Sequence, residues 1–549
     1  MAVTTAPDQL KAANPSQVRR RVRPQDWIWL ATSILLSLAL RIPLFGVPMI
    51  PDEGGYAYAT RGWIDGTGHL YKDLWISRPQ GIFIVYAGIM ETLGTGTYAF
   101  RCAAWIAIAL TTGAVWMFAR MWKTPRVANI SAIVFAILSA SPNIEGFTAN
   151  AEVFMGLPAA FAALWLLHIS RHGWSPKQLN GVGILIGLAT ILKPSGFVML
   201  PVAWVFILMI REEPARVYVR RCTTVLVGVV VVAIPIMIHG IYLGWSDFIY
   251  ATVTYRLTQQ SSASVGLAHN VIRLMVMLYS VWSMLLLLIV VEIMRNWRVL
   301  RAKSRWRPAM ARVRKLPLNV SLGLTTPGIS RLPRLERPTD DAGLILRLWV
   351  LGCLAGIAMG GDWWTHYLIQ VAAPAAIWIS AVSIGVTISL PDIRRKAVFV
   401  GIVVVLLLTP YWVLSKGSTE GMTQAMYGHP GYPAQAAVSE YLKDHTLPED
   451  TIYVAFDQAG IYYLADRKPA YRYLYNQELR GVPASYSEII AIIQGPNRPK
   501  YIVSTLHPGP FADDGRMFWH EVAKYYVVET TVEGVPVYRA KDVRDLPNR

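Results

Sequence analysis

The stretch PDEGGYAYA, residues 51–59, follows the end of the first long apolar segment of the chain. It places two adjacent carboxylates, Asp52 and Glu53, at the point where hydrophobic sequence gives way to polar sequence. A solvated loop can carry such a pair at no cost, so the pair alone fits either a functional site or a polar loop. The residues around it decide between these interpretations.

The composition on both sides of this stretch is that of a membrane protein. Of the 549 residues, 54% are hydrophobic and only 16% are charged, and the mean hydropathy of +0.37 is too high for a soluble fold. Apolar stretches of about 20 residues, the length that crosses a bilayer, recur between residues 27 and 415. Each must be helical, because lipid offers the backbone no hydrogen-bond partner. The sequence predicts about eleven spans.

The first apolar run, residues 27–48, follows the basic leader RRRVRPQD. It is too long for a signal peptide and lacks a small-residue cleavage site, so we interpret it as a retained span. By the positive-inside rule, the leader and the other basic loops lie in the cytoplasm. These loops are residues 120–126, 171–177, 211–221, 295–337 and 394–396.

The segments between the basic loops then lie outside the cytoplasm. They are residues 49–98, 142–152, 193–194, 245–270 and 361–365. Within the first of them, residues 81–93 are apolar but too short to span, and we expect an interfacial helix on the outer leaflet. The net charge of +18 is explained by the basic cytoplasmic loops, so nucleic-acid binding is not predicted.

Three domains are expected: a leader at residues 1–26, a transmembrane domain at 27–415 with a cytoplasmic loop near 295–341, and an outer α/β domain at 416–549. The last has strand-like runs at residues 451–456, 471–475, 501–505, 525–531 and 535–539, and helical patterns at 435–443 and 485–493. It carries no Walker, Rossmann or GxSxG motif. Its Asp457 and Asp466 are interpreted as turn or cap residues.

Four polar elements of the outer segments accompany the acidic pair. They are SRPQG (77–81), SPNIEGFTANAEVFM (141–155), LKPSG (192–196) and GGDWWTHYLIQ (360–370). Because all of them lie at one membrane face, their carboxylates, cations and aromatic rings can converge on one site. That combination suits a polar substrate with an anionic lipid handle.

The order and spacing of these motifs resemble the bacterial GT-C glycosyltransferases of the protein mannosyltransferase and aminoarabinose transferase group. The resemblance rests on residues 51–74, on RPQGIFIVYAG (78–88), on FTANAEVFMGLP (147–158) and on HYLIQVAAP (366–374). It implies a helical GT-C fold and transfer of a sugar, with inversion, from a polyprenyl-phosphate donor. The acceptor would be a glycolipid, polysaccharide or protein outside the cytoplasmic membrane of a bacterium.

The resemblance gives Asp52 the role of catalytic base, and burial at the lipid edge is expected to raise its pKa. Glu53 would orient the acceptor, Asp52 or a metal, and Glu152 would complete an acidic patch. For both, loop solvation is the alternative. Further pocket residues are expected at Tyr56, Tyr58, Asp362 and Tyr367.

Four cations are expected to bind the donor phosphate, because the leaving group gains negative charge as the glycosidic bond breaks. They are Arg78, Lys193, Arg256 and His366. Lys193 also fits a snorkelling anchor, Arg256 a solvated loop, and His366 a metal ligand or an interfacial histidine. The family more often has Lys in a KPPG-like motif, so Arg78 in RPQG keeps the charge and changes its geometry.

Some relatives carry a metal near this site. Ser77 stands where the aminoarabinose transferase has an acidic ligand, so no bound metal is predicted, with a divalent ion left open. A flippase or transporter of a lipid-linked sugar is the alternative function, although the sequence shows neither the repeats nor the midspan charges typical of transporters.

Overall fold

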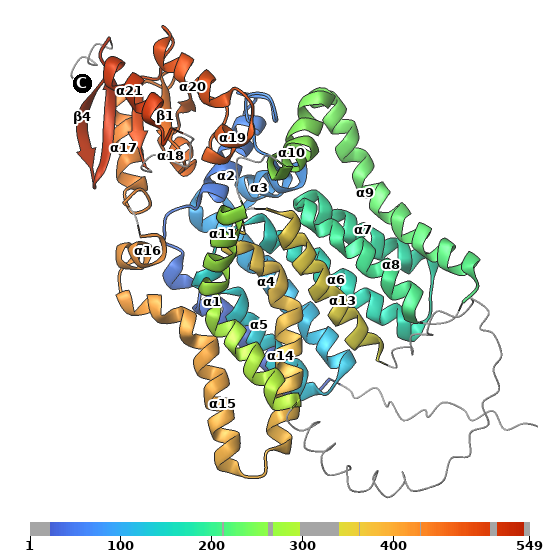
Figure 1. Ribbon diagram of the computed structural model, residues 1–549. Coiled ribbons are helices and arrows are strands. Elements are labelled where there is room, and N and C mark those ends of the chain that lie inside the picture. The colour runs from blue at the N-terminus through green and yellow to red at the C-terminus, as the bar shows by residue number, and fades with distance from the viewer. Residues whose placement is uncertain are drawn as a thin grey trace, which may run out of the picture.

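The computed structural model describes residues 22–210, 213–261, 267–296, 340–361, 363–428, 430–505 and 513–542. A bundle of long helices forms one part of the molecule, and a small α/β domain covers one end of it (Figure 1). Residues 1–21 of the predicted leader and 297–339 of the predicted basic loop lie outside the described residues.

Seven of the described helical segments are long and apolar enough to cross a membrane, or eight if the bent pair Asn270–Ser280 and Trp282–Asn296 is one span. Three shorter helices join the bundle: α5 packs against α1, α4 and α14, α7 against α6 and α9, and α8 against α13. The protein is therefore a multi-pass membrane protein, and the count of about eleven spans stays a prediction. The helices of the bundle are α1 (Pro24–Ala39), α4 (Thr97–Trp122), α5 (Pro125–Ser139), α6 (Ala151–His172), α7 (Pro176–Leu192), α8 (Met199–Ile210), α9 (Ala215–Ile249), α11 (Leu267–Ser280), α13 (Asp341–Met359), α14 (Ile369–Ser389) and α15 (Ile393–Leu408).

Two further helices, α2 (Pro51–Ile64) and α3 (Gln80–Leu93), lie between the bundle and the α/β domain (Figure 1). The second confirms the helix expected at residues 81–93. A short helix, α10 (Tyr255–Ser261), follows a π-helical turn at the end of α9 and lies beside them. These elements carry most of the residues that the sequence singles out.

The C-terminal domain has a five-stranded sheet in the order β2-β1-β3-β5-β4. β1 pairs in parallel with β2 and β3, while β5 pairs antiparallel with β3 and β4. The strands are β1 (Thr451–Ala455), β2 (Lys468–Pro469), β3 (Tyr501–Ser504), β4 (Tyr526–Val532) and β5 (Val535–Ala540). The helices are α16 (Thr419–Tyr427), α17 (Gln435–His445), α18 (Gly460–Ala465), α19 (Asn476–Gly481), α20 (Ser485–Gln494) and α21 (Arg516–Tyr525).

Four of the five predicted strands are confirmed, as are both predicted helices of this domain. The strand predicted at residues 471–475 is wrong, because the segment is irregular and the short β2 precedes it. Its alternating tyrosines are buried by contacts with other elements instead of with neighbouring strands. Tyr471 donates a hydrogen bond to Glu488, and the ring of Tyr473 packs edge-on against Trp75 at 4.9 Å.

Two glycines of PDEGGYAYA let the C-terminal domain rest directly on α2. A Cβ atom at Gly54 would collide with the backbone of Gly460, and one at Gly55 with the Tyr475 hydroxyl. That hydroxyl donates to the Pro51 carbonyl at 3.2 Å. The glycines are therefore required by close approach of two distant segments.

A buried ion pair fixes the start of α2. Arg101 of α4 forms two hydrogen bonds with the Glu53 carboxylate, at 3.2 and 2.8 Å, and both side chains are inaccessible to solvent. Glu53 also accepts from the backbone N–H groups of Ile50 and Ala149, at 3.2 and 2.7 Å. Pro51 at the first helical position and the acidic first turn further favour a helix start here.

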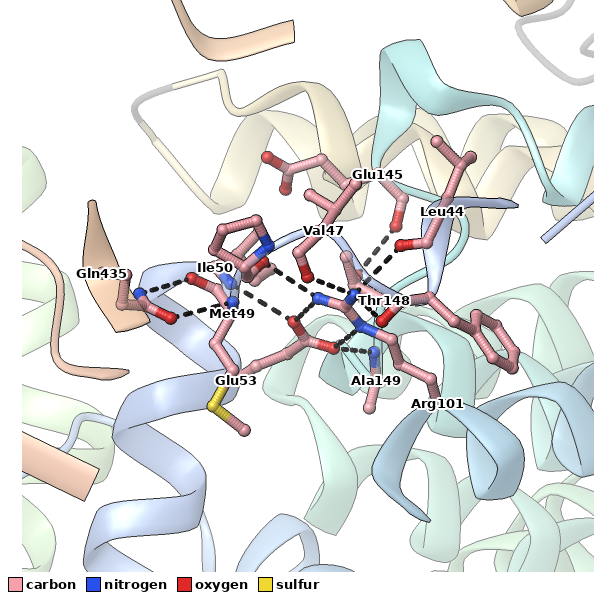
Figure 2. Close-up of polar contacts among 12 residues, drawn as sticks. Leu44, Val47, Met49, Ile50, Glu53, Arg101, Glu145, Thr148, Ala149 and Gln435 are labelled. Carbon is pink, nitrogen blue, oxygen red and sulfur yellow. Dashed lines mark hydrogen bonds and ion pairs between the residues drawn. The ribbon is translucent and has the colours of Figure 1, made fainter. Parts of the chain in front are cut away.

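Arg101 also binds the backbone of the segment that leads into α2. Its guanidinium donates to the carbonyls of Leu44, Phe45, Val47 and Pro48 at 2.6 to 3.1 Å. Figure 2 shows the guanidinium between these carbonyls and Glu53, with Gln435 of the C-terminal domain paired to the Met49 backbone. Three segments that are far apart in the sequence thus meet around one charge pair.

Replacing Arg101 by Met is expected to destabilise the protein strongly, because it leaves the Glu53 carboxylate buried and uncompensated. The expected loss is about 3 to 5 kcal/mol, seen as a lower thermal midpoint of the detergent-solubilised protein. Arg395→Met removes an arginine from an exposed pair with Asp392 and should cost at most about 1 kcal/mol. Equal effects of the two substitutions would contradict this account.

Candidate active site

A pocket lies between one end of the helical bundle and the C-terminal domain. Its wall from the membrane domain comprises Ile50, Pro51, Asp52, Ile76, Ser77, Arg78, Glu145, Arg256, Trp364, His366 and Tyr367. Its wall from the C-terminal domain comprises Tyr432, Asp457, Tyr475, Asn476, Gln477 and Glu478. Four of the five segments predicted to share the outer face contribute residues to this lining. The fifth segment, residues 193–194, lies next to the pocket, because Lys193 contacts the lining residue Tyr367.

Asp52 occupies the first turn of α2, and its side chain is 22% exposed. One carboxylate oxygen, Oδ2, lies 3.6 Å from the Arg78 guanidinium and 3.7 Å from Nε2 of His366. The side chain thus lines the pocket and lies beside both Arg78 and His366.

Arg78 lies just before α3 and is almost completely buried. Its Nε donates to the Tyr56 hydroxyl at 3.0 Å, and its Nη1 donates to the Ser77 carbonyl. Tyr71 donates in turn to the Arg78 carbonyl at 2.9 Å. These hydrogen bonds orient the guanidinium in the pocket wall. Tyr56 contributes by accepting a hydrogen bond from Arg78.

Lys193, at the end of α7, is buried and forms an ion pair with Glu152 of α6. Its ammonium also lies 3.9 Å from the centre of the Tyr367 ring. A snorkelling side chain would extend to the membrane surface, so that alternative does not describe Lys193. Burial lowers the pKa of Lys193 to about 8, because the nearby Glu152 carboxylate only partly offsets it.

His366 begins the segment that leads into α14, and it connects three carboxylates. Its Nδ1 lies 3.1 Å from Glu145, while its Nε2 lies 3.7 Å from both Asp52 and Glu152. The Nε2 atom is buried and has no hydrogen-bond partner. A ligand oxygen in the pocket would supply one.

Arg256 of α10 completes the cationic side of the pocket. Its guanidinium donates to the Ser77 hydroxyl at 2.7 Å. Ser77 was singled out in the sequence only as a departure from an acidic metal ligand. In the structure its hydroxyl accepts the hydrogen bond from Arg256 and so links α10 to the segment that precedes α3 and contains Arg78.

The pKa of Asp52 lies below its ordinary value, which differs from the expectation that burial would raise it. Burial does act in that direction and is the largest influence. The positive charges around the carboxylate outweigh it, and they belong to Arg78, His366, Lys193 and Arg256. The expectation of a raised pKa took account of burial but not of the combined positive charge of these four side chains.

Five predicted site residues do not line the pocket, and they are Glu53, Tyr56, Tyr58, Glu152 and Lys193. Glu53 is enclosed by Arg101 and backbone N–H groups, so it has no exposed oxygen with which to orient an acceptor. Tyr58 packs against Tyr462 of the C-terminal domain at 6.1 Å and does not line the pocket. Glu152 lies behind the wall, paired with Lys193. Asp362 lies outside the described residues.

The sequence analysis missed several residues of the site. Glu145 lines the pocket from a backbone conformation with φ 54°, next to His366. Asp457, interpreted as a turn residue, and Glu478 face the same pocket from the C-terminal domain. A single sequence does not reveal that Glu145 adopts a positive φ. It also does not reveal that Glu478 of the C-terminal domain and Asp52 line the same pocket.

The geometry gives a metal ion little to bind. Across the described ranges, no group of three His, Cys, Asp or Glu side chains is arranged to hold one. The reason lies in the pairing: Arg78 already faces Asp52, and Lys193 already faces Glu152.

Comparison with known proteins agrees with the resemblance seen in the sequence. Residues 77–242 match the model of the dolichyl-phosphate-mannose-protein mannosyltransferase family. The structure resembles the crystal structure of ArnT from Cupriavidus metallidurans bound to undecaprenyl phosphate, with a TM-score of 0.55 and 14% identity over 94% of this chain and 98% of that chain. The apo form of the same ArnT gives a TM-score of 0.55 and 15% identity over the same shares.

A third similar structure is an oligosaccharyltransferase from Archaeoglobus fulgidus tethered with an acceptor peptide. It has a TM-score of 0.50 and 12% identity, and the match covers 87% of this chain and 69% of that chain. Curated protein sequences give no match. These similarities confirm the predicted GT-C fold.

Two carboxyls of the pocket predict an unusual pH dependence of stability. Burial raises the pKa of Asp457 to about 7 and that of Glu478 to about 8. In the unfolded chain both titrate near 4, so the folded protein binds more protons between about pH 4 and 8. Stability should therefore fall as pH rises through this range.

The measurement is the thermal midpoint of the purified protein between about pH 5 and 8.5. The midpoint should decrease with pH, and Asp457→Asn together with Glu478→Gln should flatten the curve. Asp52 does not contribute to the slope there, because a lowered pKa affects stability only below about pH 4. A double variant with the slope of the wild type would contradict the raised pKa values.

Proposed function

We propose that this chain is an inverting glycosyltransferase that moves a sugar from a polyprenyl-phosphate donor to an acceptor at the outer face of a bacterial cytoplasmic membrane. The observation that carries this proposal is the partly exposed Asp52 carboxylate, placed among cations at one end of a helical bundle. The undecaprenyl phosphate named for the ArnT crystal structure supports the donor class.

The donor phosphate would bind to the cationic side of the pocket. Arg78 and Arg256 have guanidinium groups suited to phosphate oxygens, and Nε2 of His366 has no hydrogen-bond partner. When the bond between the anomeric carbon and the phosphate oxygen breaks, its electron pair stays on the phosphate. Preorganised positive charge stabilises the negative charge that develops there.

Asp52 would act as the base on the opposite side of the sugar. The acceptor hydroxyl forms a bond to the anomeric carbon and transfers its proton to the Asp52 carboxylate. Attack from the face opposite the leaving group inverts the anomeric centre and needs only one base. In the structure Asp52 lies 3.6 Å from Arg78 and 3.7 Å from His366, so this step requires the bound sugar to separate the carboxylate from these cations.

Donor binding would also adjust the base. In the structure described here, the surrounding cations hold the pKa of Asp52 below its ordinary value. A phosphate anion bound to the same cations offsets part of their field, so the pKa of Asp52 rises. The carboxylate thereby becomes a stronger base when a donor is present.

The positive-inside distribution of the basic loops supports a location of the pocket and the C-terminal domain outside the cytoplasm, which is where we propose the reaction occurs. The sugar, the polyprenol length and the acceptor depend on the shape of the pocket. The acceptor peptide named for the archaeal structure keeps a protein acceptor among the candidates, beside glycolipids and polysaccharides.

Asp52→Asn is expected to lower the rate of polyprenyl-phosphate release by about 10² to 10⁴-fold, because the amide cannot accept the proton. The assay incubates the purified protein with polyprenyl-phosphate derivatives of mannose, arabinose, galactose and glucosamine. Asp466→Asn removes a carboxylate from a surface pair with Arg61 and should leave the rate unchanged.

If the Asp52→Asn variant released polyprenyl phosphate at the rate of the wild type, Asp52 would not be the catalytic base. Absence of release from every donor, together with movement of labelled lipid across proteoliposomes, would favour the flippase alternative.

Activity is expected to survive chelation, because Asp52 and Glu152 already pair with Arg78 and Lys193. The purified protein should show no stoichiometric zinc or manganese by elemental analysis, and treatment with EDTA should not slow donor turnover. Stoichiometric metal whose removal abolishes turnover would contradict the prediction.

A further inference from the structure

The two walls of the pocket differ in chemistry. The membrane-domain wall carries Arg78, Arg256 and His366 beside the carboxylates of Asp52 and Glu145. The wall from the C-terminal domain carries carboxyl, amide and phenol groups and, among its described lining residues, no Lys, Arg or His. The first wall offers positive charge to a phosphate, whereas the second offers none.

Glu478 is the most informative residue of the second wall. It lies in α19, is 2% exposed, and its Oε2 atom has no hydrogen-bond partner. Its backbone carbonyl accepts from Val482 N–H at 2.8 Å and from the Ser485 hydroxyl at 3.1 Å, so the residue is held in place. A buried carboxyl oxygen without a partner is costly, and a ligand that supplies one recovers that cost.

Asp457 faces the same pocket from the loop that follows β1. Its Oδ1 accepts from the Gln458 N–H at 3.0 Å, and its backbone carbonyl accepts from the Thr505 hydroxyl at 3.1 Å. Two aromatic residues, Tyr432 and Tyr475, line the wall beside these carboxyls. Polar groups that converge beside apolar ring faces are typical of a site for a small polar molecule with apolar faces.

We propose that Glu478 and Asp457 bind the hydroxyl groups of a sugar ring, so that the C-terminal domain supplies one half of the active site. The inference rests on the proposed function and names the ligand of the second wall. The ring belongs either to the donor or to a sugar-containing acceptor, since both present the same hydroxyl chemistry.

The protonation of the two carboxyls agrees with this ligand. Burial raises the pKa of Glu478 to about 8 and that of Asp457 to about 7, so both hold a proton for much of the time near neutral pH. A protonated carboxyl donates one hydrogen bond and accepts others. Hydroxyl groups, which also donate and accept, match it in both directions.

The first experiment measures binding of free rings to the full-length protein, independently of turnover. The probes are methyl glycosides of mannose, arabinose, galactose and glucosamine, and undecaprenyl phosphate serves as a ligand without a sugar. The variants are Glu478→Leu, Glu478→Gln and Asp457→Asn, with the exposed Glu449→Gln as the matched control.

The wild type should bind at least one glycoside, and Glu478→Leu should weaken that binding about tenfold or more through lost hydrogen bonds. Affinity for undecaprenyl phosphate should stay within about twofold in all variants. If Glu478→Leu also loses undecaprenyl phosphate, its fold is damaged, and the size-preserving Glu478→Gln and Asp457→Asn variants decide. No glycoside binding by the wild type, or equal binding by these variants, would overturn the inference.

The second experiment distinguishes the two sources of the ring in the turnover assay. A donor ring predicts that Glu478→Gln raises the apparent KM for the donor while the affinity for undecaprenyl phosphate is unchanged. An acceptor ring predicts that the variant raises the apparent KM for the acceptor and leaves hydrolysis of the donor by water unaffected.

The failures of the two proposals are distinguishable. Donor turnover by a protein that binds no glycoside would overturn the role of Glu478 and keep the glycosyltransferase. Glycoside binding that depends on Glu478, in a protein that turns over no donor, would keep the sugar site and overturn the proposed reaction.

Discussion

The buried pair between Glu53 and Arg101 is the interaction on which the rest of the site depends. Adjacent residues on a helix do not face the same way, so the two carboxylates of the acidic pair reach different surroundings. Glu53 holds the N–H groups of Ile50 and Ala149 and thereby fixes α2 against the loop that carries Glu145. Asp52, one position earlier, is left to face the pocket.

The second constraint is the close approach of the C-terminal domain to α2. Gly54 and Gly55 permit it, and Gln435 reinforces it through two hydrogen bonds to the Met49 backbone. As a result, the nine residues of PDEGGYAYA pair with Arg101 of the bundle, present a carboxylate to the pocket and contact the C-terminal domain. The C-terminal domain is therefore part of the pocket wall.

Much of this arrangement could be predicted from the sequence, since hydropathy and basic loops place Asp52, Arg78, Arg256 and His366 at one membrane face before any contact is known. What could not be predicted depends on tertiary contacts. The partner of Glu53 is 48 residues away in α4, and Glu478 reaches the pocket from a separate domain. The pKa of Asp52 follows from the sum of several charges, whose distances no spacing in the sequence defines. The irregular segment at residues 471–475 was mistaken for a strand because its alternating apolar residues pack against Trp75 and α20 instead of neighbouring strands.

The central claim is that the cations around Asp52 form the site for the donor phosphate. A cryo-EM structure of the wild-type protein with bound undecaprenyl phosphate tests this claim most directly. The account predicts phosphate oxygens within hydrogen-bonding distance of Arg78, of Arg256 and of Nε2 of His366, in the pocket that Asp52 lines. A phosphate bound elsewhere on the bundle, with these three side chains unchanged and unoccupied, would contradict it.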